Sequence, residues 1–235
     1  MPWNLLPFTR AFAETLKVYR LNTYPLLHLS FLHLLPNTLC LVPLLDRFET
    51  THGTITTFLL FTGAFGLIPG GLYTILERFI FGLNSSAIGA SVWVFLLLAN
   101  ESIKTYRQNP NFTIGDYRVP TWTTPLLMIV LVAFLVPHTS FLGHLCGAFT
   151  GYLWGLEYIR FLAPPEKVLR WIEGKLNLLG RLPHYVSVDS KTFGRYGVLP
   201  STEGGARVGP GRGALGAVDA GTGLGTLGGS QRLGP

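Results

Sequence analysis

Long apolar runs, separated by short polar loops, dominate the chain between residues 25 and 162. We mark five apolar segments, which are Pro25–Leu45, Thr54–Leu76, Ala87–Ala99, Trp122–Pro137 and Thr139–Leu156. A membrane-spanning helix needs about 17–25 predominantly apolar residues. The first, second and fifth segments meet this length, and the other two are short. Because a short span is tolerated where its ends line a watered cavity inside protein, the short segments are a first indication of a functional site.

The chain changes character after the last apolar segment. Residues 164–183 alternate basic and apolar side chains, a pattern typical of an amphipathic helix that lies at a membrane surface. From Ser201 to Pro235 the chain is rich in glycine and poor in branched apolar residues, which predicts disorder. We therefore predict four regions: a pre-span or lumenal segment (1–24), a transmembrane domain (25–162), a cytosolic basic amphipathic segment (163–200) and a disordered tail (201–235).

The composition agrees with a membrane protein. The chain of 235 residues is 48% hydrophobic and 13% charged, whereas about a quarter of the residues in an average soluble domain are charged. Only 12 charged residues fall between Pro25 and Leu162, six acidic and six basic. This composition excludes a nucleic-acid-binding domain, a disordered chain and a disulfide-stapled secreted module. Cys40 and Cys146 both lie in apolar runs, so we expect them to be reduced packing residues.

The net charge of +6 comes from the two ends of the chain. Residues 1–24 contribute +2, residues 163–235 contribute +4, and the central region is neutral. Because basic residues collect on the cytosolic side of membranes, the C-terminal side is predicted to be cytosolic. Five spans then place the basic N-terminal segment in the lumen, against this rule. We expect either that this segment is an exception or that a further span precedes it.

Four polar residues inside the apolar segments are candidates for chemistry, because polar side chains are expensive in a membrane. They are His33, Asn37, Ser91 and His144. Ser91 and His144 each lie four or five residues from the lumenal start of a segment, which puts both about 6–8 Å deep at 1.5 Å per residue. A hydroxyl and an imidazole at one level are what a Ser–His nucleophile and base require.

Glycines around this pair favour close helix packing. Gly143, Gly147, Gly151 and Gly155 recur every four residues, and Gly89 and Ala90 precede Ser91. Such small-residue ridges let two helices approach backbone to backbone. A packing seam would explain the glycines alone, and a lone His144 could be a helix-to-helix hydrogen bonder. The matching depth of Ser91 favours the catalytic interpretation.

His33 and Asn37 are four residues apart and share a helix face, from which both can donate hydrogen bonds to an oxyanion. His28 is expected to project elsewhere and to be structural. A metal site made of His28, His33 and His144 is a weak alternative, because neither an HExxH run nor an intramembrane carboxylate completes it. None of the four aspartates lies in a span, so the catalytic unit is expected to be a dyad without metal or cofactor.

These residues together resemble a known family. The pattern His28-x4-His33-x3-Asn37 in one segment, Gly89-Ala90-Ser91 opening a later one and His144-x2-Gly147 in a glycine-ridged last one is similar to the rhomboid intramembrane serine proteases. The resemblance covers about residues 21–162. Two wider runs, Tyr24–Glu49 and Pro164–Pro200, are similar to a fungal, Golgi-resident group within that family.

The resemblance implies an all-α, polytopic bundle of membrane helices, with Ser91 as nucleophile, His144 as base, and Asn37 and His33 at the oxyanion. It also implies single-span membrane proteins as substrates, membrane lipid as surroundings and no nucleic-acid partner. The resulting hypothesis is a serine endopeptidase of the Golgi or early secretory pathway. Its site faces the lumen, its C-terminus is cytosolic, and it cleaves substrates near the point where they enter the membrane.

Three departures from the family pattern support an alternative. Val92 follows Ser91 where many rhomboids carry glycine, Pro36 should kink the helix beside Asn37, and the first of six spans has no counterpart. The alternative function is a catalytically inactive, rhomboid-like protein that binds transmembrane segments for trafficking or degradation. A small transporter is a third hypothesis, which lacks support because the chain has neither paired intramembrane charges nor repeated halves.

Overall fold

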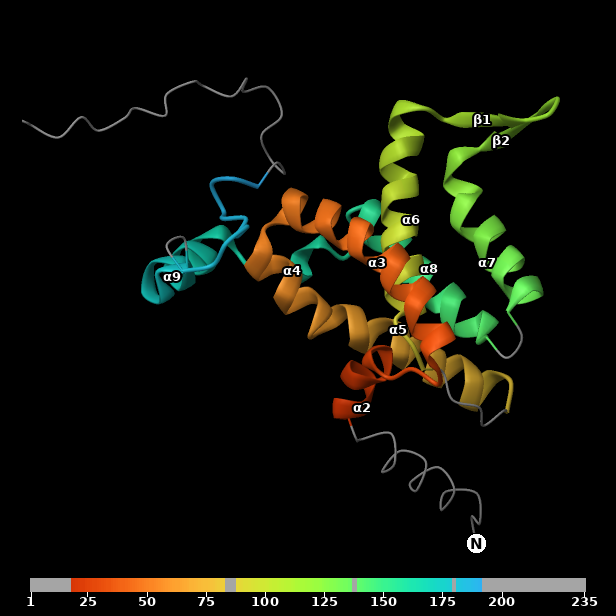
Figure 1. Cartoon of the computed structure of the whole chain (residues 1–235), viewed down its shortest axis with the longest axis horizontal. Helices are drawn as coiled ribbons and strands as arrows, with labels where there is room; N and C mark the ends of the chain where they lie inside the picture. The colour runs from red at the N-terminus through yellow and green to blue at the C-terminus, as the bar shows by residue number, and fades with distance from the viewer. Residues whose placement is uncertain (1–17, 83–87, 137–138, 179–180, 192–235) are drawn as a thin grey trace, which may run out of the picture. The chain divides into compact units, whose positions relative to one another are not determined.

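A computed structural model describes residues 18–82, 88–136, 139–178 and 181–191, and these ranges are mainly helical (Figure 1). The proposed disordered tail and most of the N-terminal segment lie outside them. In chain order the helices of the first half are α2 (Val18–Thr23), η1 (Tyr24–Leu26), α3 (Phe31–His52), α4 (Thr54–Phe61), α5 (Ala64–Ile75) and the π-helical turn η2 (Leu76–Ile80). The second half contains α6 (Ser91–Gln108), η3 (Thr121–Thr123), α7 (Thr124–Leu135), α8 (Phe141–Gly155), η4 (Arg160–Leu162) and α9 (Glu166–Leu176).

The first apolar segment is bent rather than continuous. Pro25 lies in the 3-10 turn η1, and α3 begins only at Phe31, where the Ser30 hydroxyl caps the helix by accepting a hydrogen bond from the His33 amide. The axis of residues 20–26 meets that of α3 at 96°. The prediction of one helix from Pro25 is therefore wrong, and a polar cap is the physical reason.

The second apolar segment forms a long helical run. It extends from Thr54 to Ile80, with a break between α4 and α5 at Thr62 and Gly63. Within the described residues, this run alone is long and apolar enough to cross a membrane by itself, and the bent pair formed by residues 20–26 and α3 adds a second if it is counted as one span. The count of five spans stays a prediction.

Helices α6 and α8 lie side by side at the centre of the bundle. A Cβ atom on Gly147 would overlap the Val92 carbonyl, and one on Gly151 would overlap the Leu96 carbonyl. These two glycines therefore let the backbones approach more closely than any side chain would permit, as their four-residue spacing predicts. Helix α6 begins at Ser91 and continues to Gln108, well beyond the predicted end at Ala99.

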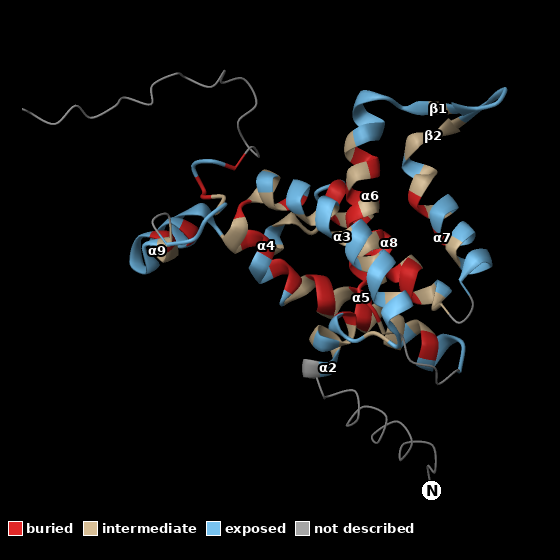
Figure 2. Cartoon of the chain, viewed as in Figure 1, coloured by how far each residue is buried: buried red, intermediate tan, exposed pale blue. Residues whose placement is uncertain are grey.

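The buried residues concentrate on α4, α5, α6 and α8, together with Phe48 of α3 (Figure 2). Aromatic side chains fill this core: Phe48, Phe61, Phe65, Trp93 and Trp154. In contrast, large apolar side chains on the outer faces of α3 and α7 are exposed, including Leu32 and Phe134. An apolar surface of this kind is costly in water and is suited to lipid contact.

Two elements differ from the prediction: a hairpin replaces a loop, and the amphipathic helix is shorter. Strands β1 (Asn111–Ile114) and β2 (Tyr117–Pro120) form an antiparallel hairpin in the loop between α6 and α7, with Asn111 opposite Pro120. The predicted amphipathic helix over residues 164–183 is present as the shorter α9, which ends where Asn177 adopts a left-handed conformation.

Candidate active site

Ser91 is the first residue of α6, directly after a tight turn. Gly89 has a φ of +119°, a conformation that side chains rarely permit. Two hydrogen bonds from other segments fix this turn: the Gly89 amide donates to the Tyr24 carbonyl (3.1 Å), and the Ala90 amide donates to Nε2 of His28 (3.2 Å). Ser91 therefore lies at the N-terminus of its helix, not one turn inside it as predicted, because the glycine turn ends the loop later.

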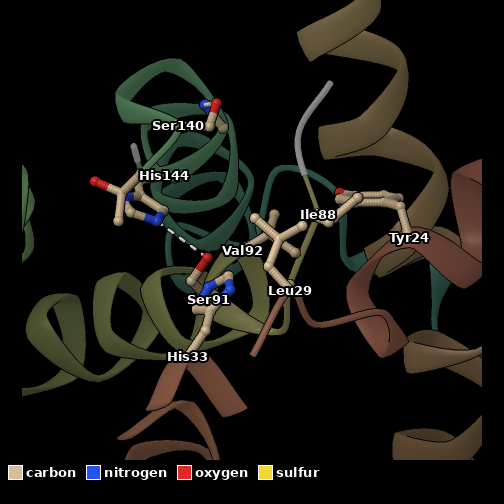
Figure 3. Close-up of a pocket in the computed structure, with 11 residues that line it drawn as sticks. Tyr24, Leu29, His33, Ile88, Ser91, Val92, Ser140 and His144 are labelled. Atoms are coloured by element: carbon tan, nitrogen blue, oxygen red, sulfur yellow. Dashed lines mark hydrogen bonds between the residues drawn. The ribbon is translucent and has the colours of Figure 1, made fainter. Parts of the chain in front are cut away.

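His144 is held beside Ser91 by α8, which the Ser140 hydroxyl caps by accepting a hydrogen bond from the Gly143 amide. The Nε2 atom of His144 lies 3.0 Å from the Oγ atom of Ser91 (Figure 3). The His144 side chain is buried, and its ring packs on that of Phe95 with centroids 4.6 Å apart. The structure thus brings together the two residues that the sequence pairs.

The second ring nitrogen of His144, Nδ1, differs from Nε2 in its hydrogen bonding. The Nδ1 atom is buried and makes no hydrogen bond among the described residues. When Nε2 accepts the Ser91 hydroxyl proton, Nδ1 must carry the other proton of the neutral ring. The arrangement is therefore that of a pair, without the carboxylate that orients the histidine in a catalytic triad.

His33 and Asn37 approach the same site from α3, although in different ways. The His33 ring points toward Ser91 and lines a cavity with it (Figure 3). Asn37 lies one turn further along α3, and its amide nitrogen donates to the His33 carbonyl at 2.9 Å. A Cβ atom on Gly89 would lie 2.8 Å from Cε1 of His33 and 3.8 Å from the Asn37 amide nitrogen, so both side chains lie against the turn before Ser91.

The position of His28 corrects the sequence interpretation. His28 precedes α3, and its ring contacts the His33 ring edge-on, with centroids 5.3 Å apart. It therefore does not project elsewhere: its Nε2 accepts the Ala90 amide next to the nucleophile turn. The expectation of a structural role agrees with this contact. Ser30, a strong helix-capping residue, is the sequence signal that could have placed His28 outside the helix.

A small cavity of about 60 Å³ lies over Ser91 (Figure 3). Its polar wall is made by Ser91, His33 and His144, and its apolar wall includes Leu29 and Ile88. This volume accommodates water beside the hydroxyl. Among the described residues, no group of three His, Cys, Asp or Glu side chains is arranged to hold a metal ion.

Comparison with known proteins places this chain in a family. The sequence profile of the Rhomboid domain matches residues 15–161. The chain belongs to the rhomboid family. Membership implies a helical bundle in a membrane, in agreement with the apolar segments and with the exposed apolar faces of α3 and α7.

Fungal relatives specify the branch of the family. Rhomboid-type serine protease B of Aspergillus fumigatus is 55% identical over 221 residues, which cover 93% of this chain and 76% of the relative. Rhomboid-type serine protease 2 of Neurospora crassa is 55% identical over 218 residues (93% and 75% of the two chains), and that of Saccharomyces cerevisiae is 37% identical over 197 residues (80% and 74%). No solved structure matches the chain significantly. The predicted family and enzyme class, a rhomboid-type serine endopeptidase, are confirmed.

The structure also locates two departures from the family pattern. Val92 is buried against Gly147 of α8 and also lines the cavity, and the hydrogen bond between Ser91 and His144 is present beside it. Pro36 lies inside α3, which is assigned as one helix from Phe31 to His52. Neither residue keeps Ser91, His33 and His144 from lining one cavity.

Proposed function

We propose that this rhomboid-type protease cleaves with a dyad in which Ser91 is the nucleophile and His144 the general base. The observation that carries the proposal is the 3.0 Å contact between Nε2 of His144 and Oγ of Ser91. In the first step the Ser91 oxygen attacks the carbonyl carbon of the substrate peptide while its proton moves to His144. His144 then donates this proton to the leaving amine, and water hydrolyses the acyl-enzyme in the reverse sequence.

The developing oxyanion needs donors that already point to it. The His33 ring reaches the cavity directly, and the Ser91 amide opens the first turn of α6, where helical amides are not used within the helix. Asn37 can contribute after its amide turns from the His33 carbonyl toward the cavity, because both lie within one turn of α3. We therefore assign His33 as the preformed donor and Asn37 as the assisting donor.

The substrate class follows from membership of the family. Rhomboid proteases act on transmembrane substrates, and we propose single-span membrane proteins, cut near the point where they enter the membrane. The basic residues after α8 favour a cytosolic C-terminus, and the site then faces the lumen. The resemblance of residues 24–49 and 164–200 to a fungal, Golgi-resident group favours a Golgi or early secretory location. The alternative of an inactive binding protein is disfavoured by the paired Ser91 and His144.

Covalent labelling tests the dyad directly. Purified full-length protein in detergent is treated with a fluorophosphonate or an isocoumarin probe, which reacts only with an activated serine. We expect labelling of Ser91 in the natural chain and none in the Ser91→Ala or His144→Ala variants. Ser140→Ala is the matched control, because this hydroxyl caps α8 near the same cavity and is not assigned a role in the reaction. Labelling that persists in Ser91→Ala would refute the assignment.

A further inference from the structure

The C-terminal helix α9 has two faces that the structure separates. Leu169 and Glu173 are buried, and Glu173 contacts the segment that follows the helix. Trp171, Val168 and Leu176 are exposed, with 64%, 45% and 52% of their surface accessible. The sequence pattern predicts one amphipathic helix. The structure shows that only part of its apolar surface is buried in the protein and that the rest is exposed.

The inward face fixes the direction in which α9 points. One carboxylate oxygen of Glu173 accepts hydrogen bonds from the Tyr185 hydroxyl (2.9 Å) and the Val188 amide (2.8 Å). Partial burial and this hydrogen bond raise the pKa of the Tyr185 phenol, so it stays protonated and continues to donate. Val186, between these two residues, pairs with Thr54 at the start of α4 through two hydrogen bonds of 2.9 Å. Helix α9 is thus tied to the turn between α3 and α4.

The outward face combines apolar and basic side chains. At 100° per residue, Trp171, Val168 and Leu176 occupy one arc of the helix, and Lys175 lies within this arc while Lys167 lies at its edge. An indole is suited to a membrane interface because its ring is apolar and its N–H can reach water. Lysine stems can lie along the same surface and extend their ammonium groups to headgroups.

The two acidic side chains of α9 interact with other residues of the protein. Glu166 forms an ion pair with Lys191 at 2.7 Å, and Glu173 accepts the two hydrogen bonds from the 185–188 segment. Among the described residues of α9, the outward arc therefore presents Lys167 and Lys175 and no acidic side chain. This charge is complementary to anionic phospholipids, which concentrate in cytosolic leaflets.

From this separation we propose that the outward face of α9 binds the cytosolic membrane surface. Trp171, Val168 and Leu176 insert at the boundary between headgroups and acyl chains, and Lys167 and Lys175 contact anionic headgroups. Only residues 156–165 connect α9 to α8, and the Thr54–Val186 pair holds it near the end of α3, so it is close to where the helices leave the membrane. The inference rests on the proposed topology and is independent of the dyad.

Trp171 provides the probe for the first test. The full-length protein is reconstituted in vesicles of phosphatidylcholine with about 30% phosphatidylserine, and its fluorescence is compared with that of Trp171→Phe, because the chain contains five tryptophans. The difference between the two proteins gives the fluorescence of Trp171. We expect lipids brominated near the headgroup end of the acyl chains to quench this fluorescence and iodide not to quench it. Access to iodide without lipid quenching would overturn the proposal. Shielding from iodide without lipid quenching would overturn it too, since a protein would then cover the face.

The basic residues supply a second test. Each lysine near an anionic surface strengthens binding about fivefold, so the double variant Lys167→Gln/Lys175→Gln should lose most of the dependence of lipid quenching on phosphatidylserine. Arg170→Gln is the control for each single lysine variant, because it also removes one positive charge from the same helix but at the edge that pairs with Asp189 at 2.7 Å. Equal loss in Arg170→Gln and in the single lysine variants would contradict a specific outward face.

The topology is measured separately, so the two proposals can fail independently. A C-terminal tag on protein in sealed microsomes should be accessible to added protease. A shielded tag would refute the proposed topology. An accessible tag together with a water-exposed Trp171 would refute membrane binding by α9 and leave the topology standing.

Discussion

His144 and Ser91 are separated by 53 positions in the chain, and the Nε2 atom of the first lies 3.0 Å from the Oγ atom of the second. Helices α6 and α8 can hold these atoms together because Gly147 and Gly151 let their backbones nearly touch. The short contact therefore depends on the close packing, because a side chain at either glycine would overlap the backbone of α6 and force the two helices apart.

The first prediction concerns the reacting pair. Ser91→Ala and His144→Ala should each lower cleavage of a single-span reporter by at least about 10⁴-fold, because either change removes the whole nucleophile–base unit. The double variant should be no worse than the single variants, since the two residues act together. Cleavage is measured with purified protein in vesicles, and membrane insertion is checked by resistance to carbonate extraction. Residual cleavage above 1% in Ser91→Ala would contradict the proposed nucleophile.

The second prediction separates the two oxyanion donors. Asn37→Ala should reduce kcat by less than His33→Ala, because Asn37 donates to the His33 carbonyl and must turn before it can reach the cavity. Loss of one donor costs about 10²–10³ in rate, which sets the range for His33→Ala. Both variants should keep KM within a few-fold of the natural value. A larger loss in Asn37→Ala than in His33→Ala would reverse our assignment.

The third prediction concerns His28 as a positioning residue. Its ring accepts the Ala90 amide at 3.2 Å and so holds the turn that presents Ser91. His28→Ala should lower kcat by roughly tenfold, comparable to losing one hydrogen bond, while KM stays nearly constant. His28→Gln offers a different acceptor and should recover part of the rate. If both variants cleave like the natural chain, the turn needs no such support.

The fourth prediction tests the packing of α6 on α8. In Gly147→Ala the new methyl group overlaps the Val92 carbonyl, so the helices must separate, and the free energy of unfolding should fall by about 1–3 kcal/mol. Gly71→Ala is the matched control, because a Cβ on this glycine of α5 meets nothing within 4 Å and alanine favours helix. Thermal denaturation in a mild detergent measures both. Equal stability of the two variants would show that the glycine contact is not required.

Sequence periodicity predicted most of the helices and the pairing of Ser91 with His144, but not the local breaks. Counting from the ends of the apolar segments paired Ser91 with His144, which meet in the structure, but it placed Ser91 one turn too deep in its helix. The bend before α3 could not, because Pro25 and His28 lie in an apolar run whose interruption depends on the Ser30 cap. A capping hydroxyl and a glycine with positive φ act on single peptide units, which an average over a segment of 20 residues cannot detect.

The C-terminal segment illustrates the same limit. Amphipathic spacing predicted a helix after the last span, and α9 is present. The spacing could not show that Glu173 faces inward, since a buried carboxylate needs partners that arrive 12 and 15 residues later in the chain, at Tyr185 and Val188. A carboxylate such as Glu173 on the apolar side of a helix indicates that polar partners must come from elsewhere in the fold, and only the structure identifies them.

The last prediction concerns the tie between this segment and the membrane helices. Thr54→Val removes the hydroxyl that accepts the Val186 amide, although it keeps the shape of the side chain. We expect the Val186 amide to exchange its hydrogen about fivefold faster, which corresponds to the loss of about 1 kcal/mol for one hydrogen bond. Hydrogen exchange followed by mass spectrometry resolves the 185–191 peptide in full-length protein. Thr51→Val is the control, because the Thr51 hydroxyl donates only to the Arg47 carbonyl of its own helix. Faster exchange in both variants, or in neither, would show that the Thr54 hydroxyl does not hold the C-terminal segment to α4.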